Sequence, residues 1–484
     1  MRNRGVVAGL LLTALSGPLA AQPVFSNIFP PEEYAARRAR VMEQIGDGVA
    51  IMLGTTERPG EQPMRQANQF HYLVDVVDPR AMLVMDGRTK RTTLYLHPEG
   101  ERREGSEGPV LHPGDSAARV TGVDAVVKVD EFAVTVAEIA RENRTIYTGL
   151  RPEVLGMASA VDPANLWKNN RNDPWDGRDS REEAFIRHLK AAAPGSVMRD
   201  LDPVIDKLRV IKSPGEQQIM REGSRVAGLG IIEAMRDAKV GMYEYELQAP
   251  AEYVFKKYGS YGGAYFAIIA TGTNTEHSHY NRDTDKLEDG DLVLFDYAPD
   301  YKYYAHDVTR MFPASGKFNK WNREYYTIYL RMYQALMTSI KPHAEPRAIM
   351  LEAGAKMGKI IAAYPFTDPR IKEAATRFAA QYQNAPAYAG SLGHGVGLEV
   401  HDVRRTSGPL QPGEVFTIEP AMTIPEMHLS CRIEDMILVT QTGYENMSAF
   451  VPVEPADIEK LMAQRGLSTY AYKLPATVPP RSVW

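Results

Sequence analysis

The chain has 484 residues, enough for two or three domains, and 44% of them are hydrophobic and 24% charged, as in an ordinary globular protein. A formal net charge of −5 gives no electrostatic basis for binding nucleic acid or an anionic membrane. The one cysteine, Cys431, excludes an intramolecular disulfide framework and a cysteine-rich zinc site.

The N-terminus has the pattern of a secretory signal peptide over 1–21. Arg2 and Arg4 precede an uncharged apolar run over 6–15, and small residues end just before Gln22. The run is too short to span a bilayer comfortably, and an uncleaved N-terminal anchor is the alternative. We expect an exported protein, periplasmic or secreted, with no membrane span after the signal is cleaved.

The next segment, 22–200, predicts an α/β domain. A helix is expected over 31–45, where apolar residues share one face, and buried strands over 48–54, 81–87 and 92–98, where Gly, Asp or Pro bound the apolar runs. These elements alternate, as they do in α/β domains.

Two polar stretches of this domain are expected at its surface. Residues 99–118 are rich in glycine and charge, which favours a loop. Residues 169–183 combine charged residues with asparagine, which favours an exposed segment.

A domain boundary is expected over 200–213, where a long amphipathic helix begins. Ser213 and Glu216 fit a reciprocal capping box, with proline at the first helical position. The sequence then favours an α+β domain over 201–465, and the proline-rich residues 466–484 predict an extended tail.

Alternation and aromatic residues over 291–313 predict two strands joined by a tight turn. We place the turn between Tyr301 and Lys302. Asp296 and Asp307 then lie directly opposite each other, with Cβ atoms about 4.5–5.5 Å apart. Two carboxylates so close repel unless a proton or a cation lies between them. Two unrelated surface aspartates are the alternative, although the apolar residues before Asp296 make a solvated position there less favourable.

Two more strands are expected over 413–422 and 431–440, each with one acid among apolar residues, Glu419 and Glu434. Asp435 points the other way in its strand and is the weaker candidate. A buried unpaired carboxylate costs several kcal/mol. Four acids in apolar strands would offset that cost if they converged on cations.

The stretch GHGVGLEVHD, 393–402, holds two histidines among glycines. His394 is the best candidate for a nitrogen ligand, and oxygen ligands with one imidazole suit Mn, Fe, Co or Zn. A regular strand would place His394 and His401 on opposite faces. A bend at the glycines would bring both into one pocket, and the sequence leaves the two arrangements open.

These residues together resemble the pita-bread metallopeptidases, the family of Xaa-Pro aminopeptidase (aminopeptidase P) and prolidase. RQANQFHYL (65–73) is similar to the aminopeptidase P N-terminal domain, and LRVIKSPGE (208–216) to the start of the catalytic domain. The resemblance covers about 31–462. It implies an α/β N-terminal domain followed by an α+β pita-bread (creatinase/aminopeptidase) catalytic domain.

The resemblance also implies a dinuclear metal site and a set of catalytic residues. The metal ligands would be Asp296, Asp307, His394, Glu419 and Glu434, with Asp307 and Glu434 bridging the ions. The catalytic residues would be His279, His401, Glu419 and Arg432. In these roles the two histidines contact the substrate, Glu419 transfers a proton, and Arg432 supports the first aspartate and helps to relay protons.

The implied activity is that of an Xaa-Pro aminopeptidase, a metallo-exopeptidase that removes the N-terminal residue from peptides with proline second. Two divalent ions are expected. Mn²⁺ is the favoured ion, and Zn²⁺, Co²⁺ or Fe²⁺ are the alternatives. The expected partners are proline-containing peptides, with no nucleic acid, and a second copy of the chain in a dimer or tetramer. An Xaa-Pro dipeptidase (prolidase) and a non-catalytic or creatinase-like member of the fold are the alternatives.

Three positions depart from the family pattern. Many relatives have a histidine where this chain has Gly390 and a tyrosine where it has Thr423, and glycine is usual at Cys431. The first two bear on the rim of the proline pocket and on the oxyanion contacts, not on the metal ligands.

Overall fold

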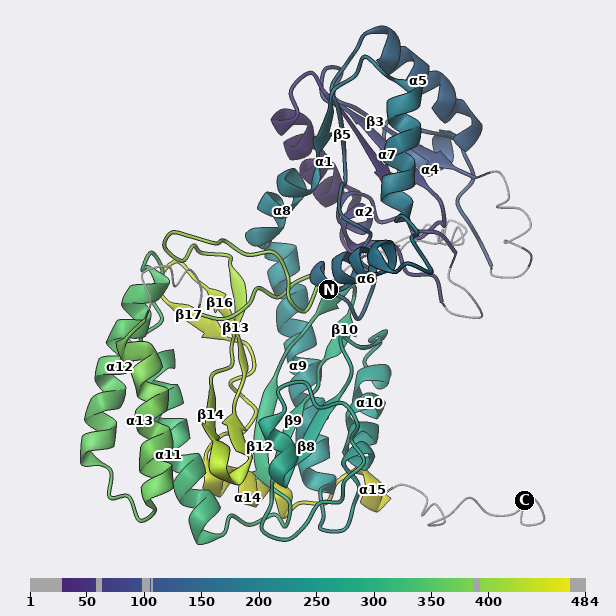
Figure 1. The fold of residues 1–484 in the computed structure, drawn as a ribbon. Coiled ribbons are helices and arrows are strands. Elements are labelled where there is room, and N and C mark those ends of the chain that lie inside the picture. The colour runs from purple at the N-terminus through teal and green to yellow at the C-terminus, as the bar shows by residue number, and fades with distance from the viewer. Residues whose placement is uncertain (1–27, 58–62, 98–104, 106–107, 386–391, 471–484) are drawn as a thin grey trace, which may run out of the picture.

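The computed structural model describes residues 28–57, 63–97, 105, 108–385 and 392–470, and Figure 1 shows a smaller N-terminal part above a larger C-terminal part. The expected signal peptide and most of the expected tail lie outside the described residues, as does Gly390. Within the described chain, every helix is too short or too polar to cross a membrane.

The N-terminal part is built around a mixed six-stranded sheet in the order β4-β3-β2-β1-β5-β6. Its strands are β1 (Val49–Leu53), β2 (Met82–Asp86), β3 (Arg91–Leu96), β4 (Ala125–Lys128), β5 (Ile146–Thr148) and β6 (Met198–Asp200). Its helices are α1 (Pro31–Gln44), α2 (Asn68–Leu73), α4 (Asp115–Thr121), α5 (Phe132–Arg141), α6 (Val161–Asn172) and α7 (Arg181–Ala192), and α8 (Asp202–Val210) leads out of it. The predicted helix over 31–45 and the three predicted strands are confirmed, with small differences at their ends.

The loop prediction for 99–118 is wrong at its C-terminal end, because α4 begins inside it. Gly114 precedes α4 with a φ of 133°, a conformation that favours glycine. The helix then buries Ala117 and Thr121. The polar composition of 99–118 favoured a loop, because only two residues of this short helix are buried.

The C-terminal part places helices on both sides of a curved set of strands, with α11, α12 and α13 on one side and α9 and α10 on the other (Figure 1). The helices are α9 (Pro214–Asp237), α10 (Gln248–Lys257), α11 (Lys320–Met337), α12 (Pro346–Ala363), α13 (Pro369–Gln383), α14 (Pro455–Met462) and α15 (Leu467–Tyr470). The strands are β7 (Gly262–Gly263), β8 (Ile268–Thr271), β9 (Leu292–Asp296), β10 (Pro299–Tyr301), β11 (Tyr304–Ala305), β12 (Thr309–Pro313), β13 (Val415–Ile418), β14 (Ala421–Ile424), β15 (Leu429–Arg432), β16 (Asp435–Val439) and β17 (Tyr444–Asn446).

Helix α9 begins with the predicted capping box. The Ser213 hydroxyl accepts from the Glu216 N–H at 3.2 Å, and the Glu216 carboxylate accepts from the Ser213 N–H at 2.8 Å. Two N–H groups at the helix end are thus satisfied by side chains close in sequence, which is why the sequence predicts this start.

The predicted register of the aspartate hairpin is wrong by one residue at the turn. Lys302 and Tyr303 occupy the turn, with φ of 53° and 69°. Two residues in the left-handed region match the twist of a two-residue hairpin. Asp296 therefore lies opposite Thr309, and Asp307 is its diagonal neighbour rather than its direct partner.

Each of the two predicted acidic strands is broken at its acid. Glu419 lies between β13 and β14, and Glu434 between β15 and β16. At the first break, Pro420 has no N–H to continue the hydrogen bonding of the strand. At the second, the Glu434 N–H donates to the Thr309 carbonyl of β12 at 3.0 Å, and not to β13 or β14. Because the strands bend at these points, both acids can reach the hairpin that carries the aspartates.

The tip of that hairpin packs against the N-terminal part. The Tyr303 ring stacks on His71 at a centroid distance of 3.7 Å, and Arg65 Nη1 lies 2.6 Å from Asp300 Oδ2. The two parts of the chain are therefore joined next to the strands that carry the candidate ligands.

Candidate functional site

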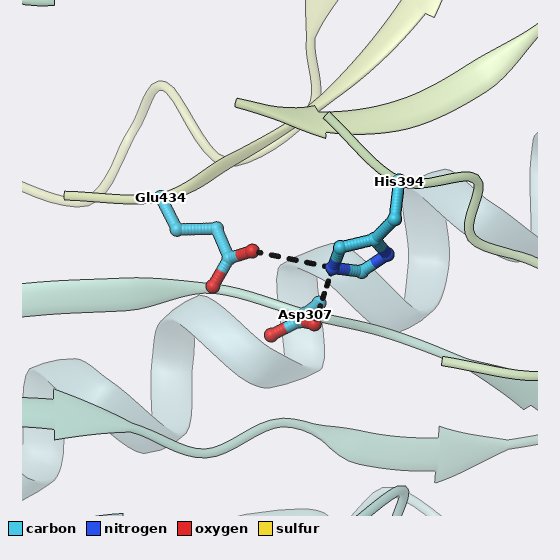
Figure 2. Close-up of side chains that lie close together, drawn as sticks. All are labelled: Asp307, His394 and Glu434. Carbon is cyan, nitrogen blue, oxygen red and sulfur yellow. Dashed lines mark ion pairs between the residues drawn. The ribbon is translucent and has the colours of Figure 1, made fainter. Parts of the chain in front are cut away.

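Three predicted ligands from distant segments converge in one cluster. Figure 2 shows the side chains of Asp307, His394 and Glu434 pointing toward one another, and their ligand atoms all lie within 4.8 Å of each other. His394 Nε2 lies 3.5 Å from Asp307 Oδ2 and 3.9 Å from Glu434 Oε1. The bends described above bring these groups together.

The other two predicted ligands border this cluster. Glu419 Oε1 lies 3.0 Å from His394 Nε2. Asp296 is linked to Asp307 through Tyr265, whose hydroxyl lies 2.6 Å from Asp296 Oδ1 and 2.7 Å from Asp307 Oδ1. All five predicted ligands thus lie at one site.

Tyr265 was not among the predicted site residues. It lies in an aromatic and apolar stretch just before β8, a pattern that resembles any buried strand edge. Burial, and then the charges of Asp296 and Asp307, raise the pKa of Tyr265 well above its ordinary value, so its hydroxyl stays protonated. A phenol has one proton and can donate to only one of the two aspartates at a time.

The cluster of acids is electrostatically unsatisfied without cations. Burial, reinforced by neighbouring carboxylates, raises the pKa of Glu434 well above its ordinary value. Burial raises the pKa of Asp296 to about 7 although Arg432 opposes the shift. Burial opposes the charged form of His394, but Asp307 and Glu419 raise its pKa to about 10. Protons therefore have to offset the repulsion among the acids.

The residues present fit divalent cations. Glu434 Oε1 is buried and has no hydrogen-bond partner among the described residues, which leaves an acceptor free for a ligand. Hard oxygen donors with one imidazole are the set that Mn²⁺, Fe²⁺, Co²⁺ or Zn²⁺ accepts. Cations at this position would neutralise the carboxylates that otherwise need protons.

The glycine-rich stretch takes the bent arrangement, not the regular strand. Its backbone bridges Gly395 to Asp402, and a Cβ on Gly393 would lie 1.9 Å from the Thr417 carbonyl oxygen. The rings of His394 and His401 are perpendicular with centroids 4.3 Å apart. The exposed His279 lies next to His401, with its ring centroid 6.4 Å from that of His401. The structure thus brings both predicted substrate-binding histidines beside the candidate ligands.

Two further side chains hold the acids in place. Arg432 Nη2 donates to Asp296 Oδ2, and its Nη1 donates to the Ser278 carbonyl at 3.3 Å. The hydroxyl of Thr309 donates to Glu434 Oε2 at 2.8 Å. Arg432 was among the predicted residues. Thr309 was not, because only the observed register places it beside Glu434.

Asp435 faces away from the cluster, as predicted from the alternation of its strand. Its Oδ1 lies 2.7 Å from Arg310 Nη2 and 2.6 Å from the Ser448 hydroxyl, and its Oδ2 accepts from the Tyr333 hydroxyl at 2.7 Å. Arg310 is fully buried. Asp435 therefore neutralises a buried guanidinium and has a structural role.

Two of the departures, Thr423 and Cys431, lie within the described residues, and both are accommodated locally. Thr423 Oγ1 lies 3.2 Å from Ser430 Oγ. Cys431 is fully buried, and burial raises the pKa of its thiol well above the ordinary value. A protonated thiol without exposure is a packing residue, not a nucleophile.

The chain matches two family models. "Metallopeptidase family M24" matches 218–441, and "Aminopeptidase P, N-terminal domain" matches 34–147. These two ranges include every predicted site residue and the sheet of the N-terminal part up to β5.

Similar proteins match nearly the whole chain. The Xaa-Pro aminopeptidase of Escherichia coli is 30% identical over 451 residues, which are 89% of this chain and 97% of that protein. The Xaa-Pro aminopeptidase of Haemophilus influenzae is 28% identical, over 90% of this chain and 97% of that protein. The structure of E. coli aminopeptidase P with the inhibitor Pro-Leu has a TM-score of 0.69 and 27% identity, covering 90% of this chain and 98% of that chain.

Proposed function

Because the chain belongs to metallopeptidase family M24, in the group that carries the aminopeptidase P N-terminal domain, we propose that it is an Xaa-Pro aminopeptidase. Such an enzyme hydrolyses the bond between an N-terminal residue and a following proline. The observation that carries the proposal is the convergence of four acids and His394 in one cluster beside two further histidines. The full-length similarity to two Xaa-Pro aminopeptidases supports the same activity.

A metallopeptidase of this family uses divalent cations, and we propose that this site holds two. Asp296, Asp307, His394, Glu419 and Glu434 would hold them. Mn²⁺ is the proposed ion, with Zn²⁺, Co²⁺ and Fe²⁺ as alternatives. Metal analysis of the purified protein, followed by chelation and reloading with each ion, tests both the number and the identity.

When bound, the cations would polarise the scissile carbonyl and lower the pKa of water. Glu419, whose side chain is 32% exposed, reaches both the cluster and the solvent, so it can accept a proton from the attacking water and pass it to the leaving nitrogen. Arg432 donates to Asp296 Oδ2, the carboxylate oxygen that Tyr265 does not contact.

His401 is suited to stabilising the negative charge that develops on the carbonyl oxygen. Burial lowers the pKa of His401 below its ordinary value, so its imidazole is neutral at neutral pH and carries one N–H to donate. His279 lies farther out and reaches solvent, where it can contact the part of the peptide that follows the scissile bond.

The substrate prediction is that the site requires proline second and a free amino terminus. An Xaa-Pro bond has no N–H, so a proline pocket needs apolar contacts and no acceptor. If ring contacts supply about 3 kcal/mol, kcat/KM for Ala-Ala-Ala should be about 10²-fold lower than for Ala-Pro-Ala. N-acetylation should abolish cleavage, because it removes the positive charge by which the acids of the cluster would attract the amino terminus.

A matched set of four peptides tests this prediction: Ala-Pro-Ala, Ala-Ala-Ala, acetyl-Ala-Pro-Ala and the dipeptide Ala-Pro. Cleavage of Ala-Pro alone would reassign the protein as an Xaa-Pro dipeptidase. Equal cleavage of Ala-Ala-Ala would refute proline specificity. Hydrolysis that survives complete removal of metal would indicate a creatinase-like member of the fold.

We also propose that the protein is exported to the periplasm or the medium and assembles as a dimer or tetramer. The charged end and apolar run within 1–21 support export. N-terminal sequencing of the protein from fractionated cells should find residue 22 first, and a cytosolic protein that retains Met1 would contradict export. Light scattering after size exclusion tests the assembly, which a monomeric mass would refute.

A further inference from the structure

The loop that carries His401 is held by charges buried beneath it. Arg209 Nη2 lies 2.7 Å from Glu399 Oε1 and also donates to Asp402 Oδ1, and Lys212 Nζ lies 3.0 Å from Asp402 Oδ2. Each of these four side chains is only 1% exposed. We refer to Arg209, Lys212, Glu399 and Asp402 as the ionic latch.

The same loop is bound to the N-terminal part of the chain. The Ser159 hydroxyl accepts from the His401 N–H at 2.9 Å, and Glu399 Oε2 accepts from the Ala160 N–H at 2.8 Å, just before α6. Asn68, the first residue of α2, donates to the Leu398 carbonyl at 2.9 Å. Segments from both parts of the chain therefore fix residues 398–402.

The latch leaves the loop little room to shift. A Cβ on Gly397 would lie 2.0 Å from Asp402 Oδ2 and 3.0 Å from Lys212 Cε, so the carboxylate fills the space next to the backbone. Glu399 and Asp402 point into the protein on either side of His401, whose ring faces His394. Glu399 and Asp402 thus anchor the backbone two residues before and one residue after His401.

Buried ion pairs are a poor source of stability, because desolvation of both charges offsets their attraction. Two carboxylates and two cations in one buried cluster are better explained by the geometry that they impose. Charged hydrogen bonds have preferred directions, which apolar packing lacks.

We propose that the ionic latch and Ser159 are positioning residues that hold His401 in place for catalysis. The N-terminal part of the chain then contributes to the reaction through a histidine of the C-terminal part. This inference rests on the proposed function, in which His401 contacts the carbonyl oxygen of the substrate.

A double-mutant cycle tests the latch in the metal-loaded full-length enzyme with Ala-Pro-Ala. Glu399→Gln keeps the shape and removes the charge, and it should lower kcat by about tenfold with metal content unchanged. Ser159→Ala is the milder variant and should lower kcat by about threefold. In a His401→Ala background both changes should alter kcat by less than about twofold, because there is no imidazole left to position.

A control variant separates positioning from general loss of stability. Asp86→Asn breaks a pair with Arg144, at 2.7 and 2.8 Å, in the sheet of the N-terminal part and away from the loop. It should leave kcat unchanged. Hydrogen exchange should speed up over 398–402 in Glu399→Gln and Ser159→Ala but not in Asp86→Asn.

The outcomes are distinct. Equal losses of kcat with and without His401, or exchange over 398–402 that is unchanged in both Glu399→Gln and Ser159→Ala, would overturn the positioning role while leaving the proposed function in place. A metal-loaded wild-type enzyme that does not cleave Ala-Pro-Ala would overturn the proposed function and with it the catalytic role of the latch.

Discussion

Asp307→Ala is expected to release both cations and to lower kcat on Ala-Pro-Ala by at least about 10³-fold, more than the loss of a single oxyanion donor costs. Asp307 connects the other candidate ligands: its Oδ2 lies 3.5 Å from His394 Nε2, and its Oδ1 is linked to Asp296 through the Tyr265 hydroxyl. Glu434→Ala should have the same effect, because Oε1 of its buried carboxylate has no hydrogen-bond partner among the described residues and is free to hold a cation. Metal analysis and peptide hydrolysis, measured on the same preparation, check both variants.

Asp435→Ala is the matched control, since it removes the neighbouring acid on the opposite face. Metal content should stay at the wild-type level. The free energy of unfolding should instead fall by about 3–5 kcal/mol, because Arg310 would be left as an unpaired buried charge. An Asp307→Ala protein that keeps two metals and normal turnover would contradict the assignment, as would metal loss in Asp435→Ala.

His401→Ala and His394→Ala are expected to differ in metal content. His401 lies beside the cluster, and its loss should lower kcat by about 10²-fold, as the loss of an oxyanion contact does, with metal retained. His394 contacts three acids of the cluster, so its loss should reduce metal content as well as kcat.

Metal analysis of the two histidine variants at equal protein concentration separates the roles. His279→Ala serves as the comparison variant, since its ring lies 6.4 Å beyond that of His401 and should have no effect on metal binding. Equal metal loss in the His394 and His401 variants would show that His401 is itself a ligand.

Several elements were predictable because their causes are local in sequence. The capping box at Ser213 depends on residues three apart, and the strands around 51 and 84 follow from short apolar runs with turn residues at their ends. The opposite facing of Glu434 and Asp435 was predicted from the alternation of side chains in a strand, and it holds although Glu434 lies at the break between β15 and β16. These features need no knowledge of what packs against them.

The site was only partly predictable, because its geometry depends on register and on bends. A turn one residue later, at Lys302 and Tyr303, moves Asp307 from a direct to a diagonal position and places Thr309 opposite Asp296. The breaks at Glu419 and Glu434 change which strands pair, so that β13 is hydrogen-bonded to β16 and β14 to β15. Neither effect changes the alternation of apolar and polar residues from which strands are predicted.

The sequence by itself determined the residue types of the candidate ligands, their positions in the chain and their resemblance to one family, because these depend only on residue identity and spacing. Only the tertiary structure decided that the glycine-rich stretch bends to bring His401 to His394, that Tyr265 joins the two aspartates, and that Arg209 holds the loop from beneath. These contacts join residues as far apart as 190 positions in the chain. They form when distant segments pack and exclude water, and no local pattern of side chains records that packing.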